Sequence, residues 1–148
     1  MDIVNSIVAG MVGTLFMTLF VNVGAKATGY NFHVPSILGS MMLRSTKPSG
    51  KPSRSPATLT SGYITHYLIG IAFALIYAQI STGNGKIQYS NALLFGVIAG
   101  LIAAGFWFAA LKLHPLAPRI RLLPYLVLIF IGHLVFFLGV NMVLRTMS

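Results

Sequence analysis

The stretch IVNSIVAGMVGTLFMTLFVNV, residues Ile3–Val23, contains no charged side chain. As an α-helix it would be about 31 Å long, which matches the hydrocarbon thickness of a bilayer. It therefore predicts a transmembrane helix, and the rest of the chain is interpreted from this starting point.

Three further segments are also long and apolar, at about 61–80, 91–111 and 124–144. Ser90 stands where the third span needs an N-cap, and Pro124 falls in the first turn of the fourth, where proline is tolerated. Only 7% of the residues are charged, against about 25% in soluble domains. We expect one all-α integral membrane domain over residues 1–148, a four-transmembrane-helix bundle with longer loops at 24–60 and 112–123.

The first of these loops has two parts. Pro35 suits the first turn of a helix, and the apolar residues after it predict a short interfacial helix over Pro35–Arg44. The following sequence RSTKPSGKPSRSP, Arg44–Pro56, is rich in Pro, Ser, Gly and cations. This composition predicts a flexible loop near the membrane surface.

The cations predict the orientation of the bundle. Of ten Lys and Arg residues, only Lys86 and Arg145 fall on the side of the termini. The other eight lie in the two longer loops: Lys26, Arg44, Lys47, Lys51, Arg54, Lys112, Arg119 and Arg121. Because cytoplasmic loops carry the excess of Lys and Arg, we expect both termini to be outside, or periplasmic in an inner membrane. Tyr77 and Tyr125 are expected at the two membrane interfaces.

The near-absence of acids limits the chemistry of the chain. Asp2 is its only carboxylate, and it has no cysteine. Carboxylate acid–base pairs, Ser-His-Asp triads and carboxylate or thiolate metal sites are thereby excluded, so we expect no catalytic residue and no metal site. The charge excess comes from missing acids rather than from a basic patch, which argues against nucleic acid binding. The cations expected to contact anionic lipid or an acidic partner are Lys47, Lys51, Arg54, Arg119 and Arg121.

Small and polar residues recur every fourth position in the first two spans, which places each set on one helix face. The sets are Gly10, Thr14, Thr18 and Asn22 in the first span, and His66, Gly70, Ala74 and Ala78 in the second. In a bilayer such faces are typical of helix–helix contacts. We expect the two faces to pack together.

Intramembrane polar residues predict a seam within the bundle, because each must find a hydrogen-bond partner. The seam comprises Asn5, Thr14, Thr18, Asn22, His66, His133 and Asn141. From their depths we expect three pairings: His66 with Asn22, His133 with Thr14 or Thr18, and Asn141 with Asn5 or Ser6. No cofactor is predicted, but two histidines on different helices leave axial ligation of a haem by His66 and His133 as an alternative.

In outline the sequence resembles small bacterial inner-membrane protein families of unknown function. The resemblance is carried by HYLIGIAFALIYA (His66–Ala78), by the glycine-rich third span, by the proline-containing loop after it, and by PSILGSMM (Pro35–Met42). It implies a small bacterial inner-membrane protein and assigns no site residue.

These patterns favour a non-enzymatic membrane protein, an accessory or structural subunit of a larger membrane complex. Its expected partners are membrane lipids, including anionic head groups, and other membrane subunits or further copies of the chain. One alternative is a small transporter, channel or hydrophobic-ligand-binding bundle that uses the polar seam. A second alternative is a haem-binding electron-transfer subunit.

Overall fold

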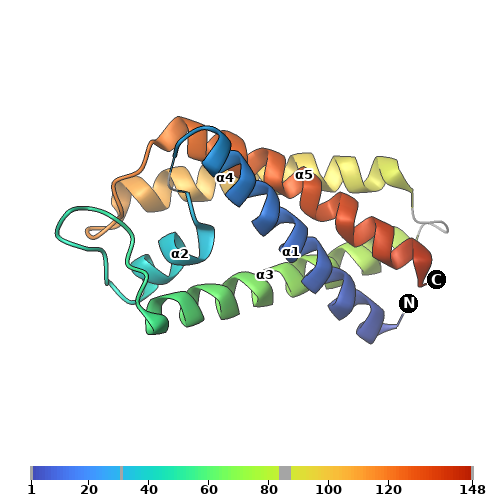
Figure 1. Ribbon diagram of the computed structural model, residues 1–148. Coiled ribbons are helices and arrows are strands. Elements are labelled where there is room, and N and C mark those ends of the chain that lie inside the picture. Colours follow the sequence, from blue (N-terminus) through green and yellow to red (C-terminus); the bar gives the residue numbers. More distant parts are fainter. Residues whose placement is uncertain (1, 31, 84–87, 148) are drawn as a thin grey trace.

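The computed structural model describes residues 2–30, 32–83 and 88–147. These residues form five α-helices and no strand: α1 (Ile3–Ala27), α2 (Val34–Met42), α3 (Pro56–Gly83), α4 (Tyr89–Leu113) and α5 (Leu122–Thr146) (Figure 1). All but α2 are long and apolar enough to cross a membrane. The predicted all-α chain with four candidate spans is thus confirmed.

Every long helix extends beyond the apolar segment that predicted it. An apolar run indicates only the part of a helix that could cross a bilayer, whereas the backbone hydrogen bonds of the helix continue past that part. The N-cap of α4 is Gln88, so the prediction of Ser90 as the cap is wrong. The short helix covers Val34–Met42 instead of Pro35–Arg44. His33 sets its start, since Nδ1 accepts a 3.2 Å bond from the Ser36 N–H, and Arg44 ends it by taking a left-handed φ of 50°.

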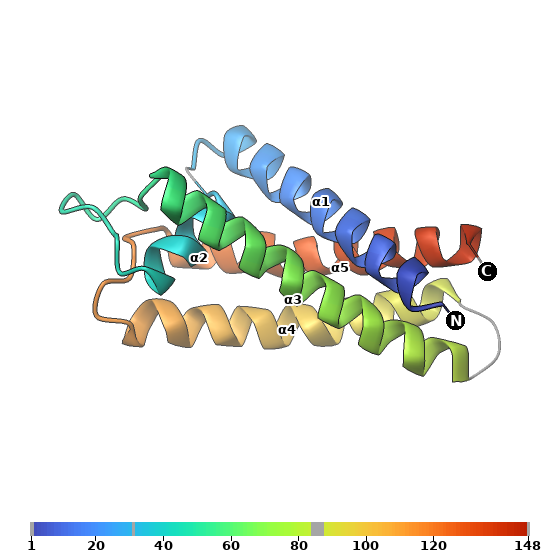
Figure 2. The ribbon, with the colours of Figure 1, turned by 90° about the horizontal axis from the view of Figure 1, so that it is seen from below.

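The four long helices lie in the spatial order α3, α1, α5, α4, which differs from their order in the chain. α1 packs against both α3 and α5, and α4 packs against α5. α3 and α4 approach each other near the loop that joins them and diverge toward their other ends (Figure 2). At the wide end, α2 packs against α3.

The α1–α3 contact uses the two small-residue faces predicted from the sequence. A Cβ added to Gly10 would lie 2.7 Å from Ile71 Cα and 3.1 Å from Ala74 Cβ, and one added to Gly70 would collide with the Thr14 hydroxyl. Such close approach is available only where one partner lacks a side chain. The prediction that these faces pack together is confirmed.

Glycines also seat α2 on α3. A Cβ on Gly39 would collide with the Thr58 carbonyl oxygen, and one on Gly62 would collide with the Pro35 carbonyl oxygen. Both neighbours are backbone atoms, which cannot rotate away as a side chain could. The two helices therefore meet almost backbone to backbone.

The loop between α2 and α3 is fixed by hydrogen bonds, so the prediction of a flexible loop is wrong. Serine hydroxyls tie it to α2: Ser36 Oγ donates to the Ser53 carbonyl at 2.6 Å, and Ser53 N–H donates to Ser40 Oγ at 2.7 Å. The loop also reaches the α4–α5 connection, where Thr46 Oγ1 donates to the Leu116 carbonyl at 2.6 Å and Arg119 N–H donates to the Gly50 carbonyl at 2.8 Å. Composition indicated the turns but could not reveal these tertiary partners.

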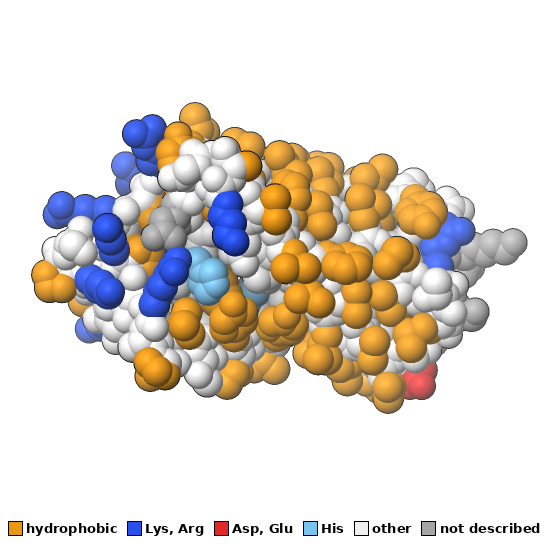
Figure 3. All heavy atoms as spheres, viewed as in Figure 1, with side chains coloured by type: hydrophobic (Ala, Val, Ile, Leu, Met, Phe, Trp, Pro, Cys, Tyr) orange, Lys and Arg blue, Asp and Glu red, His pale blue; other side chains and the backbone are white. Residues whose placement is uncertain are grey.

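Charge is concentrated at the ends of the molecule. Lys and Arg gather at the end that carries the two longer loops, whereas large apolar side chains are exposed between the ends (Figure 3). Asp2 and Arg145 lie at the opposite end with both termini; Lys86 falls outside the described residues. Tyr77 and Tyr125 are fully buried, and each ring packs inside the bundle. Their expected positions at the membrane interfaces stay predictions.

Candidate functional site

A cleft of about 310 Å³ lies between α3 and α4, on the side where these helices diverge. α1 and α5 form its floor, and α2 closes one end. This volume is at the lower end of the range of roughly 300–1,000 Å³ that is usual for small-molecule sites. The lining residues are Thr14, Met17, Val34, Leu38, His66, Ile69, Gly70, Phe73, Ile102, Ala103, Phe106, Trp107, His133 and Phe136.

The cleft is open on its outer side, which the four long helices would present to lipid. Ile69 of α3 and Ile102 of α4 both line it, yet they are 46% and 64% exposed. Phe106 lines it as well and is 61% exposed. A molecule dissolved in a bilayer could therefore enter between α3 and α4 without crossing a helix.

Three of the predicted seam residues meet in one chain of hydrogen bonds on α1 and α3. Thr14 Oγ1 donates to the Gly10 carbonyl at 2.7 Å, Thr18 Oγ1 donates to the Thr14 carbonyl at 2.7 Å, and His66 Nε2 lies 3.2 Å from Thr18 Oγ1. The predicted partner of His66 was Asn22, which is wrong by one helical turn. Depth alone cannot separate two polar residues on the same face of α1.

His133 also has a partner other than the predicted one. Its Nδ1 bonds the Ile129 carbonyl of its own helix at 2.8 Å, so the expected pairing with Thr14 or Thr18 is wrong. The histidine nevertheless lines the same cleft as Thr14 and His66. The structure therefore brings the histidines of two candidate spans, His66 and His133, to one cleft.

The seam does not continue to the termini as predicted. Asn141 is fully buried and its Oδ1 accepts a 2.7 Å bond from the Tyr77 hydroxyl. Asn5 Nδ2 instead donates to the Met147 carbonyl at 3.3 Å, and Ser6 Oγ lies 3.3 Å from the Asp2 carbonyl. The expected pairing of Asn141 with Asn5 or Ser6 is wrong, because Tyr77 of α3 reaches the Asn141 side chain instead.

The haem alternative remains a prediction. Nε2 is the usual ligating atom of histidine, together with Nδ1, and Nε2 of His66 already bonds Thr18. Ligation through that atom would require this bond to break. Within the described residues, no three His, Cys, Asp or Glu side chains are grouped to hold a metal ion.

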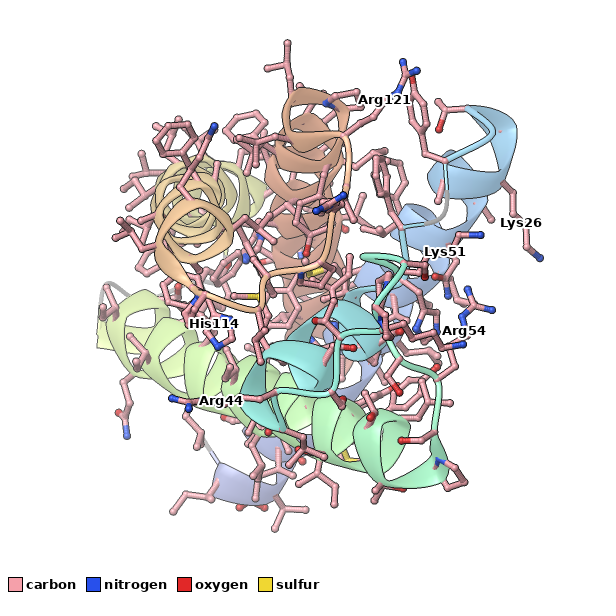
Figure 4. The ribbon with its side chains drawn as sticks, turned by 90° about the vertical axis from the view of Figure 1, so that its left-hand side faces the viewer. Lys26, Arg44, Lys51, Arg54, His114 and Arg121 are labelled. Atoms are coloured by element: carbon pink, nitrogen blue, oxygen red, sulfur yellow. The ribbon has the colours of Figure 1, made fainter. Side chains whose placement is uncertain are left out.

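The basic end of the molecule separates into two sides. Figure 4 shows Lys26, Lys51, Arg54 and Arg121 on the side of α1, and Arg44 and His114 on the side of α3 and α4. Arg121 lies over the Tyr30 ring at 5.2 Å and donates to its hydroxyl at 3.3 Å. Of the five cations predicted to meet lipid or a partner, Lys47, Lys51, Arg54 and Arg119 are exposed and Arg121 is held against Tyr30.

His33 connects this end to the fold. Its Nδ1 caps α2, and its Nε2 lies 3.2 Å from the Tyr63 hydroxyl. Burial, and then the positive charge of Arg54, lower the pKa of His33 below its usual value. The neutral ring is the form that can accept the capping bond.

The aromatic side chains that line the cleft were not predicted from the sequence. Phe106 and Trp107 come from α4, and Phe136 from α5. Aromatic residues in an apolar span give no signal of which face they occupy. The pattern of Val34 and Leu38 four residues apart in α2 could have indicated a buried apolar face.

Comparison with known proteins adds no assignment. The sequence matches no protein-family model, and neither a curated protein nor a solved structure shows significant similarity to it. Its general resemblance to small inner-membrane families thus has no matching family model behind it. Function has to be argued from the cleft.

Proposed function

We propose that this chain is a multi-pass inner-membrane protein that binds a hydrophobic molecule from the bilayer in the α3–α4 cleft. The observation that carries the proposal is the cleft itself, which is apolar, lined by two histidines and open on its outer side. Ligand sites in helical bundles take this form, an apolar pocket with a few convergent polar groups. No catalysis is proposed, because the only carboxylate, Asp2, lies at the opposite end of α1 from the loops.

The proposal includes an orientation, which the charge distribution supports. With the basic loops cytoplasmic and both termini outside, the charge distribution obeys the positive-inside rule. α2 and its loop then sit at the cytoplasmic surface, where Lys47 and Lys51 are exposed to anionic head groups. The cleft opens into the cytoplasmic half of the bilayer, since α2 closes one end of it.

An accessory-subunit role is the second candidate. Gly105 and Ala109 are exposed on α4 one turn apart, and a Cβ added to Gly105 would meet nothing within 4 Å. Small exposed residues at this spacing are typical of helix contacts in lipid. In that case a helix of another subunit would cover α4.

Two variants of α4 separate these candidates. Ala103 lines the cleft and Ala109 is exposed outside it, so Ala103→Phe fills the cleft and Ala109→Phe is the matched control. We expect native mass spectrometry of the protein, extracted in mild detergent, to find a bound small molecule in the wild type and in Ala109→Phe but not in Ala103→Phe. Equal occupancy in all three, or none in the wild type, would refute the proposal. Loss of a co-purifying protein in Ala109→Phe alone would favour the subunit role.

A further inference from the structure

The hydrogen bonds around the cleft define the polar chemistry that a ligand must bring. A threonine hydroxyl has one proton to donate. Thr18 donates its proton to the Thr14 carbonyl, so toward His66 it can only accept. His66 must therefore carry its proton on Nε2, which leaves a lone pair on Nδ1 of the neutral ring.

The same reasoning applies to the other polar side chains of the cleft. The Ile129 carbonyl can only accept, so Nδ1 of His133 is protonated and Nε2 of the neutral ring carries the lone pair. Thr14 has committed its proton to the Gly10 carbonyl. Thr14, His66 and His133 thus offer the cleft acceptors and no proton.

Neutral rings are the forms expected here. A buried cation needs a paired anion, and the chain has one acid, Asp2, whose side chain caps α1 at the end away from the cleft. Trp107 also lines the cleft, and its indole N–H is a donor that cannot accept a hydrogen bond.

We infer that the ligand is a hydrophobic molecule that ends in a hydroxyl group, an alcohol or a phenol, whose O–H donates to the free ring nitrogen of His66 or His133. This rests on the proposed binding function and adds the ligand class. A purely hydrocarbon ligand would form no hydrogen bond with either lone pair, and a ligand with only acceptors would place its own lone pairs against those of the two rings. Phe73, Phe106 and Phe136 line the same cleft and provide the apolar contact surface.

The chain contains one tryptophan, Trp107, and it lines the cleft. Its emission therefore reports occupancy without a label. The probes are para-hexylphenol and its methyl ether, which share an apolar body and differ in the O–H. With the full chain in nanodiscs, we expect both probes to change the emission and the phenol to bind about fivefold tighter, the ratio for one net hydrogen bond of roughly 1 kcal/mol.

Equal affinity of the two probes for the wild type would overturn the inference but leave the proposed function standing. No response to either probe would remove both. Substituting both histidines, His66→Leu together with His133→Leu, removes both acceptors, so the preference for the phenol should vanish while the ether still binds. A preference that persists in this double variant would overturn the inference. His114→Phe, which changes a histidine outside the cleft lining, should keep the wild-type preference; its loss there would also count against the inference.

Discussion

Two glycine-to-alanine substitutions should have opposite effects on stability. Gly62 lies in α3 against α2. A Cβ there would collide with the Pro35 carbonyl oxygen, and it would lie 2.6 Å from the Pro35 carbonyl carbon and 3.0 Å from Pro35 Cα. Gly105 lies in α4, where a Cβ would meet nothing within 4 Å. The same chemical change thus adds a methyl group to a backbone contact in one helix and to open space in the other.

The magnitudes follow from two terms. Alanine is favoured over glycine in a helix interior by about 1 kcal/mol, and this term is common to both sites. Overpacking costs about 1–3 kcal/mol, and Gly62 should lie at or beyond the upper end because its neighbours are backbone atoms. We expect Gly105→Ala to stabilise by up to about 1 kcal/mol and Gly62→Ala to destabilise by about 1–2 kcal/mol.

The assay is reversible unfolding of the protein in mixed micelles by a denaturing detergent, followed by circular dichroism. Trp107 emission gives a second readout, because α2 supplies Val34 and Leu38 to the cleft that Trp107 lines. Gly62→Ala should shift this emission and Gly105→Ala should not. If the two variants unfold at the same detergent fraction, the close seating of α2 on α3 is wrong.

Two further predictions concern buried or capping polar groups. Tyr77→Phe removes the hydroxyl that donates to Asn141 Oδ1 in a fully buried site, so it should destabilise by about 1–3 kcal/mol. Adding Asn141→Leu should restore most of this loss, and additive losses in the same unfolding assay would contradict the pairing. His33 has a lowered pKa in the folded protein, so the folded state binds its proton less readily than the unfolded state, and stability should fall as the pH drops below about 6.5. The control His33→Asn keeps a capping acceptor that does not titrate. When the pH is lowered from 7 to 5, the stability-dependent hydrogen exchange of the α2 amides should accelerate more in the wild type than in this variant. The same pH dependence in both proteins would exclude His33 as the cause of the lost stability.

The sequence predicted the spans and one packing face well, because both depend on local patterns. Apolar length located four helices, and the four-residue spacing of Gly10 and Gly70 with their neighbours identified the α1–α3 contact. Hydrogen-bond partners on different helices could not be predicted in this way. Whether His66 meets Thr18 or Asn22 depends on helix tilt and register, which periodicity does not encode.

The cleft was predictable only in part. His66 and His133 were predicted to be polar groups within the spans, and both line the cleft. Its existence depends on α3 and α4 diverging although they are neighbours in the chain, and on α2 folding back against α3. These are tertiary features set by glycine contacts and by serine bonds of the loop, such as Ser36 to Ser53.

The central place of α1 has a consequence for synthesis of the protein. α1 is the first helix to be made, yet one of its faces packs on α3 and another on α5, the last helix in the chain. Until α5 is inserted, Gly13 has no neighbour at Val140 and Phe136, the residues that a Cβ there would touch. In the proposed membrane protein, a chain that stalls after α4 would present this glycine surface to lipid, where membrane chaperones or proteases that recognise unpaired helices could distinguish it from the finished protein.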